Sequence, residues 1–366
     1  MKETFFCRRD PVPLGVVLSF LLLANAPFKL LVPVLLLLII PAGVQAQFNF
    51  TTNNGAITIT KYTGTNAVVL IPSMTNGFPV TVIEGDKGAF SHSGVTDVTI
   101  PDSVTKIGAF TFNICTNLTS IIIPDSVVFL GDQAFALCSS LTSAALGRNV
   151  ATVGHALFRA CNKLTTITVS ALNTNYISVA GVLFNINQTI LVAYPPGKSG
   201  SYSITNTVTS VGSYAFETCA DLTGITVPNS VTNIGMNAFD SCTSLAHIAI
   251  PNSVTSIGAE AFYSCDSLSA ITVPDSVTHL GNNMFASCLN LTNVIIGNGV
   301  SSIPEYAFYN CTRLTTVTIG NTVTNIGYDA FSYCGNLASV YLKGNAPGLA
   351  LQVFYADNKL TAYYPD

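Results

Sequence analysis

A phrase of 23 residues recurs through most of the chain, and its clearest marker is a cysteine at one fixed position. The cysteines in phase are Cys115, Cys138, Cys161, Cys219, Cys242, Cys265, Cys288, Cys311 and Cys334. Every interval between them is 23 residues except the one from Cys161 to Cys219, which is 58. A fixed period of this kind is typical of a solenoid, in which each repeat forms one coil and contacts its neighbours.

The apolar positions within one repeat, such as CTSLAHIAIPNSVTSIGAEAFYS, predict how a coil is built. Ile248 and Ile250 are spaced by two, which indicates a short strand. The residues Pro-Asn-Ser then predict a turn, and a second short apolar run follows. Gly258, Phe262 and Cys265 recur at intervals of four and three, which favours a short helix. We therefore expect β-rich α/β coils of strand, turn, short strand and short helix.

One coil offers too few inward apolar side chains to fold alone, so like residues are expected to stack on like residues in successive coils. The strands of neighbouring coils are expected to pair in parallel, about 4.8 Å apart. A phenylalanine column accompanies the cysteine column, and the two are the predicted structural core. The phenylalanines are Phe112, Phe135, Phe158, Phe216, Phe239, Phe262, Phe285, Phe308 and Phe331.

The phrases LTSIIIPDSV, LTGITVPNSVTNIG and LSAITVPDSVTHLG, with their AF-x-x-C endings, resemble the leucine-rich repeats of the BspA-like family of bacterial surface proteins. The resemblance covers residues 80–366. It implies a leucine-rich-repeat solenoid with parallel stacked sheets. It also implies secretion or display at the cell surface, because the family includes adhesins that bind host or matrix proteins.

Residues 1–46 are predicted to be a signal peptide. Positive residues precede two apolar runs, and the segment ends in PAGVQA, with small residues where signal peptidase cleaves. We predict cleavage after Ala46 and a protein that is secreted or displayed on the cell surface. The alternative is an uncleaved membrane anchor, which is the one membrane contact that the sequence predicts.

Residues 47–79 predict an N-terminal cap, because the first coil of a solenoid needs a cover for its core. The solenoid is predicted over 80–366, with enlarged coils at about 162–218. The added segments, Tyr176 to Gly181 and Tyr194 to Tyr202, are expected to form loops on one flank. Such loops either carry a binding site or are a tolerated bulge.

The nine cysteines in phase cannot all pair within one chain, because their number is odd. Their shared position suits a small buried hydrophobic side chain, and a column that leans one way is poorly aimed for disulfides. We expect free buried thiols. Metal ligands converge on a point, whereas a column extends along an axis, so the sequence predicts no metal site.

No catalytic constellation or cofactor motif is found in the sequence. The four histidines lie in different coils with no recurring carboxylate or nucleophile beside them. Asp102, Asp125 and Asp275 share one turn position that also accepts asparagine, which favours turn chemistry over calcium binding. Only 9% of the residues are charged and the net charge is −4, so no basic patch for nucleic acid is expected. We predict neither an enzyme nor a nucleic-acid-binding protein.

The outward position in the first strand of each coil is the candidate binding face. It carries Thr99, Ile122, Thr168, Thr226, Thr272, Ile295, Thr318 and Tyr341. A flat, weakly charged row suits contact with a protein or glycan over a large area, although threonine also occurs there for its strand propensity alone. We expect an exported recognition or adhesion protein that binds an unidentified protein or glycan ligand. The alternative is a structural envelope or matrix component that self-associates and has no specific ligand.

Overall fold

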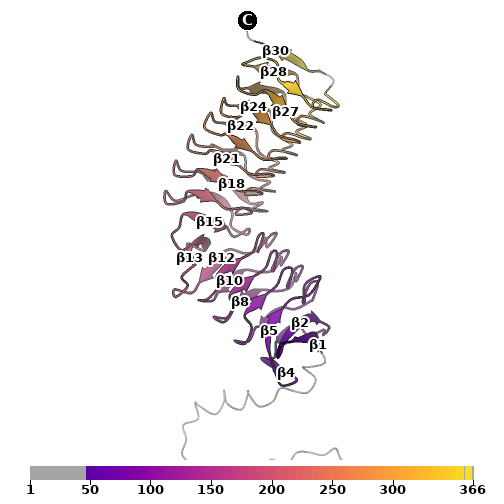
Figure 1. Cartoon of the computed structure of the whole chain (residues 1–366), viewed down its shortest axis with the longest axis vertical. Coiled ribbons are helices and arrows are strands. Elements are labelled where there is room, and N and C mark those ends of the chain that lie inside the picture. Colours follow the sequence, from indigo (N-terminus) through magenta and orange to yellow (C-terminus); the bar gives the residue numbers. More distant parts are fainter. Residues whose placement is uncertain (1–46, 358, 365–366) are drawn as a thin grey trace, which may run out of the picture. The chain divides into compact units, whose positions relative to one another are not determined.

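The computed structural model describes residues 47–357 and 359–364, so the predicted signal peptide lies outside the described residues. All of them belong to one compact unit, Gly43–Asp366. Each standard coil contributes a first strand, a turn, a short second strand and a turn segment that ends at the cysteine. The coils follow one another in chain order (Figure 1).

The first strands of successive coils pair in parallel, as predicted. They form four sheets: β3 (Val68–Leu70) with β6 (Asp97–Thr99); β8 (Ser120–Ile122), β10 (Ser143–Leu146) and β12 (Thr166–Val169); β16 (Gly200–Ser203), β18 (Leu222–Thr226) and β20 (His247–Ile248); and β22 (Ala270–Val273), β24 (Asn293–Ile296), β26 (Thr316–Ile319), β28 (Ser339–Leu342) and β30 (Thr361–Tyr363). The register joins residues 23 apart, for example Thr272 to Ile295 and Ile295 to Thr318. Equivalent side chains therefore stand above one another.

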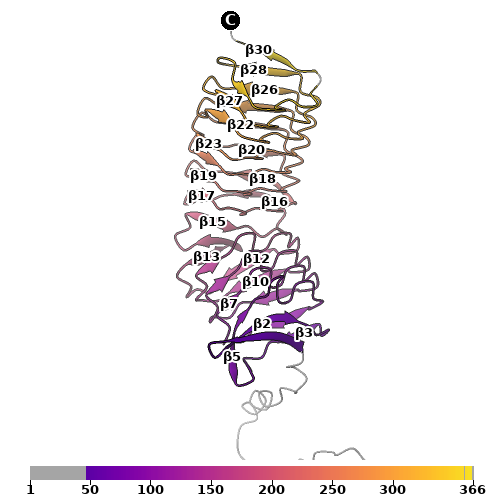
Figure 2. The ribbon, with the colours of Figure 1, turned by 45° about the vertical axis from the view of Figure 1, so that its right-hand side comes forward.

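The second strands of the standard coils also pair in parallel, in three sheets that lie beside the first strands (Figure 2). Two of these sheets also contain antiparallel pairs, β1 with β2 and β4 with β5 in one, and β14 with β13 and β15 in the other. One sheet contains β1 (Phe48–Asn53), β2 (Ala56–Tyr62), β4 (Met74–Thr75), β5 (Phe78–Ile83), β7 (Lys106–Ile107), β9 (Phe129–Leu130) and β11 (Thr152–Val153). The next contains β13 (Tyr176–Val179), β14 (Val182–Asn185), β15 (Ile190–Ala193), β17 (Ser210–Val211), β19 (Asn233–Ile234), β21 (Ser256–Ile257) and β23 (His279–Leu280). The last contains β25 (Ser302–Ile303), β27 (Asn325–Ile326) and β29 (Gly348–Leu349).

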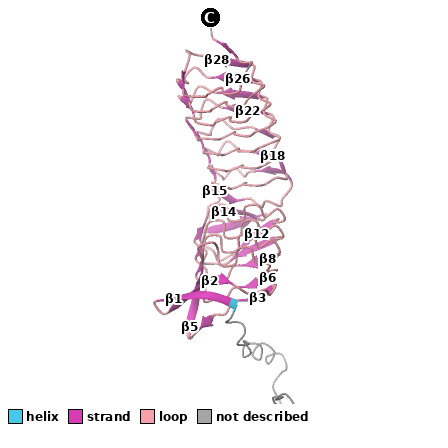
Figure 3. Ribbon diagram, turned by 90° about the vertical axis from the view of Figure 1, so that its right-hand side faces the viewer, coloured by secondary structure: helices cyan, strands magenta, loops and turns pink. Residues whose placement is uncertain are grey.

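The short helix predicted for each coil is wrong. Throughout residues 47–357 and 359–364 the segment before the cysteine is a series of turns and loops (Figure 3). The only helical residue in these ranges is Gln47, which is in a 3₁₀ turn at the start of β1. In the coil that ends at Cys265, Glu260 and Ser264 both adopt positive φ, at 56° and 51°. A residue in the left-handed region ends a right-handed helix, so no helical turn can propagate through this segment.

The turn segment uses its backbone groups to bind the next coil. The N–H groups of Glu260, Phe262 and Ser264 donate to carbonyls of the following coil over 2.9, 2.8 and 3.0 Å. The intervening N–H groups of Tyr263 and Cys265 donate three residues back within their own coil. This alternation satisfies the backbone in a ladder that crosses from coil to coil, as buried backbone requires. An α-helix would direct all of these groups back into the same coil.

Phenylalanine rings stack along the array. Phe239, Phe262 and Phe285 have ring centroids 5.2 and 5.0 Å apart and are nearly parallel. The stack also continues from Phe331 to Phe354 at the last coil. Tyr62 of β2 lies 5.1 Å from Phe90, so the segment predicted to be the N-terminal cap adds an aromatic ring to the same stack.

The nine cysteines are free and buried. In the standard coils each thiol donates to a phenylalanine carbonyl of the preceding coil, as Cys265 does to Phe239 over 3.2 Å. The same carbonyl accepts the N–H of Cys242 in its own coil. The column is therefore a series of hydrogen bonds between coils, which explains why a small residue with a donor suits this position.

The enlarged coils contain strands where a loop was predicted. Residues 176–185 form an antiparallel hairpin of β13 and β14, and β15 then pairs with β14 in the antiparallel sense. Ala180 and Gly181 form the tip with φ of 51° and 81°. Two successive positive φ values suit the two-residue turn of a twisted hairpin. The expectation of a loop from Tyr176 to Gly181 is therefore wrong.

Candidate functional site

The candidate binding face is exposed along most of its length. Thr99, Ile122, Thr168, Thr226, Thr272 and Tyr341 are exposed, whereas Ile295 and Thr318 are half-buried. Ile122 is 72% exposed and Tyr341 is 43% exposed, and the residues directly before and after each of them are buried. The face thus presents two large apolar side chains among small ones.

The strand register brings part of this row together and divides the rest. Four members stand side by side in β22, β24, β26 and β28, and Tyr341 stacks on Tyr363 of β30 with ring centroids 4.8 Å apart. Thr168 and Thr226 belong to different sheets, because the hairpin of the enlarged coils intervenes between β12 and β16. The row is therefore divided among the four first-strand sheets, and four of its eight members share the last one.

The aspartates of the shared turn position make bonds between coils. Asp125 Oδ1 accepts the N–H of Arg148 over 2.8 Å, and Asp275 Oδ1 accepts the N–H of Asn298 over 2.6 Å. Asn298 in turn accepts the N–H of Asn321 over 2.9 Å, so asparagine performs the same task. Residues 47–357 and 359–364 contain no group of three or more His, Cys, Asp or Glu side chains arranged to hold a metal ion.

A cavity of about 420 Å³ opens where the enlarged coils interrupt the array. It lies between residues 151–159 of one coil and residues 190–196 and 212–217 of the two coils that follow, and we call it the insert pocket. Tyr176 of the hairpin and Tyr214 contribute aromatic walls. The ring of Tyr214 is 5.4 Å from that of His155 on the opposite wall. The volume is within the range of pockets that bind small molecules.

The pocket exists because the ladder of the turn segments is interrupted at one step. In standard coils three N–H groups of the turn segment donate to the next coil. In the coil that ends at Cys161, the third donor, Ala160, bonds instead to Thr218 Oγ1 over 2.7 Å. The first two, Ala156 and Phe158, have no acceptor within the described residues, and both line the pocket.

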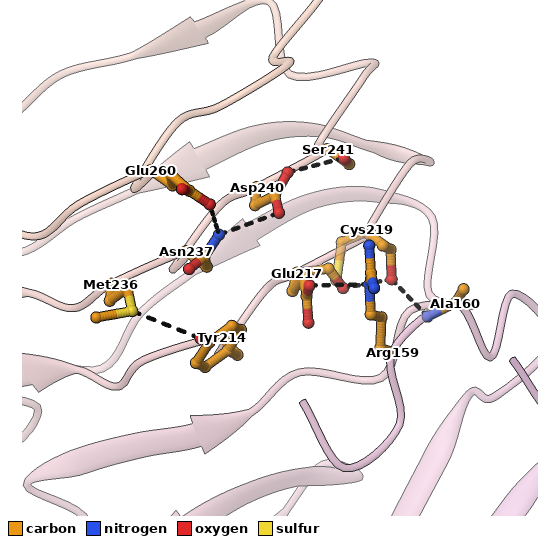
Figure 4. A network of polar contacts seen from close by, with 11 residues as sticks. Arg159, Ala160, Tyr214, Glu217, Cys219, Met236, Asn237, Asp240, Ser241 and Glu260 are labelled. Carbon is orange, nitrogen blue, oxygen red and sulfur yellow. Dashed lines mark hydrogen bonds and ion pairs between the residues drawn. The ribbon is translucent and has the colours of Figure 1, made fainter. Parts of the chain in front are cut away.

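An ion pair spans the same interruption (Figure 4). Arg159 Nε lies 3.0 Å from Glu217 Oε1, and the side chain of Glu217 is only 5% exposed. The second carboxylate oxygen, Oε2, is buried and has no partner in the described part of the chain. A buried acceptor without a partner is costly, so Oε2 marks a position where a ligand donor would be stabilised.

Burial raises the pKa of Glu217 to about 7. Arg159 lowers this pKa, while the charges of Asp240 and Glu260 raise it. Asp240 occupies the equivalent position in the next coil, and burial raises its pKa as well. Asn237 Nδ2 bridges the two outer carboxylates, at 3.2 Å from Asp240 Oδ2 and 2.9 Å from Glu260 Oε2.

Sequence reasoning missed the insert pocket, although a signal was present. Arg159, Glu217 and Asp240 each directly follow a column phenylalanine, so they occupy the same position in their respective coils. A similar signal was overlooked at Tyr194, whose ring lies 4.9 Å from Phe216 and takes the place of a phenylalanine in the stack. Phe184 is buried in β14.

Comparison with known proteins places these coils in a family. A family model of the BspA type leucine rich repeat region matches residues 83–185, 198–296 and 232–361, in 6 copies. Among solved structures, the pneumococcal vaccine antigen PcpA is 20% identical, with 87% of this chain and 98% of that chain covered and a TM-score of 0.65. A leucine-rich repeat protein from Eubacterium ventriosum is 22% identical, with 82% and 85% covered and a TM-score of 0.50.

Identities at this level show a shared fold. No curated protein matches the sequence. Within the described residues, no helix is both long and apolar enough to cross a membrane. The family model matches most of the chain, over the coils that carry the stacked strands and the cysteine column. The chain therefore belongs to the BspA type leucine-rich repeat family.

Proposed function

We propose that the chain is an exported recognition protein, secreted or displayed on the cell surface, that binds a protein or glycan along its first-strand face. It is not an enzyme in this proposal. The observation that carries the proposal is the row of uncharged side chains held in register on consecutive strands. An array of this kind offers many weak contacts over a long surface, which is how solenoid proteins present extended binding faces.

The chemistry of the face supports recognition rather than charge-driven attachment. Ile122 and the stacked pair Tyr341 and Tyr363 are exposed apolar groups, which a ligand would remove from water. The net charge of −4 and the low content of charged residues leave little long-range attraction for an oppositely charged surface.

Three observations support export. Residues 1–46 have the sequence pattern of a signal peptide. The chain has repeats of the BspA type, which resemble those of bacterial surface proteins. A protein of the same fold, PcpA, is a pneumococcal vaccine antigen. Mass spectrometry of the processed protein tests this part of the proposal. We expect its N-terminal residue to be Gln47.

Binding of the purified chain from Gln47 to an array of matrix proteins and glycans tests the recognition itself. Ile122→Asp and Tyr341→Asp place a charge on the face, and we expect each to weaken ligand retention at least about tenfold. Leu289→Asp is the matched control, because Leu289 is exposed but lies in a turn segment.

Equal retention by all three variants would contradict a role for the first-strand face. Sedimentation of the same samples tests the structural alternative. A monodisperse chain with a ligand supports recognition, whereas concentration-dependent polymers without a ligand would favour a self-associating envelope or matrix component.

A further inference from the structure

The insert pocket holds several hydrogen-bonding groups that the described residues leave without partners. Glu217 Oε2 is a buried acceptor, and the N–H groups of Ala156 and Phe158 are donors from the interrupted ladder. Arg159 contacts Glu217 through Nε, and its side chain is partly exposed beside the pocket. Donors and acceptors thus line one cavity together.

The pocket also offers aromatic surfaces. Tyr214 packs on His155 in a tilted arrangement with ring centroids 5.4 Å apart, and both residues line the cavity. Tyr176 lines the same cavity and is held in place because its hydroxyl accepts the N–H of Val153 over 3.2 Å. That bond occupies the edge of β11, where the strand of a following coil would otherwise pair. The rings are therefore fixed parts of the wall.

This combination selects among ligand classes. A purely apolar molecule would leave Glu217 Oε2 and the two N–H groups without partners, which costs free energy for each group. An anion would leave Glu217 Oε2 without a donor, and a cation would leave the two N–H groups without an acceptor. A sugar ring satisfies all of the groups, because each hydroxyl both donates and accepts and the C–H face of the ring packs on aromatic side chains.

We propose that the insert pocket binds one or two sugar rings of a neutral glycan. Glu217 Oε2 accepts a hydrogen bond from a sugar hydroxyl, the N–H groups of Ala156 and Phe158 donate hydrogen bonds to hydroxyl oxygens, and Tyr214 packs on a ring face. The cavity of about 420 Å³ accommodates a ligand of this size. The site is separate from the first-strand face and does not depend on the function proposed for that face.

Titration of the chain from Gln47 with lactose, maltose and N,N′-diacetylchitobiose tests this proposal, with calorimetry and saturation-transfer NMR as readouts. We expect at least one of these disaccharides to bind at millimolar concentration or below. Tyr214→Ala is expected to lower the affinity at least about tenfold, because it removes the aromatic surface. Glu217→Gln is expected to lower it several-fold while keeping the shape of the side chain.

Tyr306→Ala is a matched control for Tyr214→Ala. Tyr306 occupies the same position four coils further along, also adopts positive φ, and does not line the pocket. Circular dichroism melts of all variants separate loss of fold from loss of the site. Absence of binding by all three disaccharides, or equal binding by the Tyr214→Ala and Tyr306→Ala variants, would overturn the proposal. Tyr341→Asp is expected to leave disaccharide binding unchanged, which separates this site from the first-strand face.

Discussion

Arg159 and Glu217 form an ion pair, with Nε and Oε1 3.0 Å apart, across the step where the 23-residue period is broken. Beside them, the N–H of Ala160 donates to Thr218 Oγ1 over 2.7 Å. The end of one turn segment therefore contacts the end of another directly, while the extra residues of the enlarged coils are accommodated elsewhere. This contact defines one end of the insert pocket.

Removal of Arg159 is expected to destabilise the chain. Arg159→Ala removes the donor to Oε1 and the charge that lowers the pKa of Glu217, so the buried carboxyl loses its partner, which we expect to cost about 1–3 kcal/mol in the free energy of unfolding. The double variant Arg159→Ala/Glu217→Gln is expected to be less destabilised, because the neutral amide needs no counter-charge. Chemical denaturation of the four proteins of this cycle measures the coupling. Additive effects of the two substitutions would show that the side chains do not interact.

Stability is expected to decrease as the pH rises through the neutral range. Burial raises the pKa of Glu217 to about 7, well above the ordinary pKa of a glutamate, so between these two values the folded state binds more protons than the unfolded state. The free energy of unfolding then falls with increasing pH, on the order of 1–3 kcal/mol for one such group. Burial also raises the pKa of Asp357 to about 7, which acts in the same direction.

Denaturation curves measured from about pH 5 to about pH 8 test this sign. Glu217→Gln is expected to make the decline shallower, since the variant has no carboxyl group to titrate at this position. Asp357→Asn is the second variant, and it is expected to remove the part of the pH-dependent decline in stability that Asp357 causes. A decline of the same slope in the wild type and in Glu217→Gln would contradict the burial of this carboxyl.

Truncation within the phenylalanine stack is expected to be costly. Phe262 is fully buried between Phe239 and Phe285, so Phe262→Ala leaves a cavity that neighbouring coils cannot close. We expect a loss of about 3–5 kcal/mol in the free energy of unfolding. Phe129→Ala is the control, because the Phe129 ring is partly exposed on a second strand and its removal is expected to cost about 1 kcal/mol or less. Similar losses for both would be inconsistent with the stacked core.

The thiol column is expected to resist modification in the folded protein. Cys288 is fully buried, and burial raises the pKa of its thiol to about 12, so little thiolate forms at neutral pH. Iodoacetamide labelling followed by mass spectrometry is expected to modify Cys242, Cys265 and Cys288 only after denaturation. A cysteine introduced at the exposed position Thr272 provides the reactive comparison. Native labelling of Cys288 at the rate of the introduced residue would show that the column is accessible.

The 23-residue period was sufficient to predict the stacked parallel strands. Alternating apolar residues such as Ile248 and Ile250 indicate a strand with one buried and one exposed face, and the fixed period places such a strand in every coil. It was not sufficient for the turn segment. Intervals of three and four between Gly258, Phe262 and Cys265 are compatible with a helix and equally with successive turns. The segment forms turns because Glu260 and Ser264 adopt positive φ. Neither glutamate nor serine favours positive φ as glycine does, so the residue types did not predict this conformation.

The insert pocket could not be predicted from periodicity, since it depends on where the ladder stops. Two clues were nevertheless in the sequence. The Ala180-Gly181 pair between β-branched residues indicated a hairpin rather than a loop. Arg159 and Glu217 occupy the same coil position, one before and one after the 58-residue interval between Cys161 and Cys219. Since equivalent positions stack, this shared position predicted that the two side chains would meet.

A crystal structure of the chain from Gln47, soaked with the disaccharide that binds in titration, tests the central claim most directly. We expect Arg159 and Glu217 in contact, the N–H groups of Ala156 and Phe158 directed into the insert pocket, and a sugar ring against Tyr214. A continuous ladder from Ala156 and Phe158 to the next turn segment, with no cavity between the two coils, would contradict it.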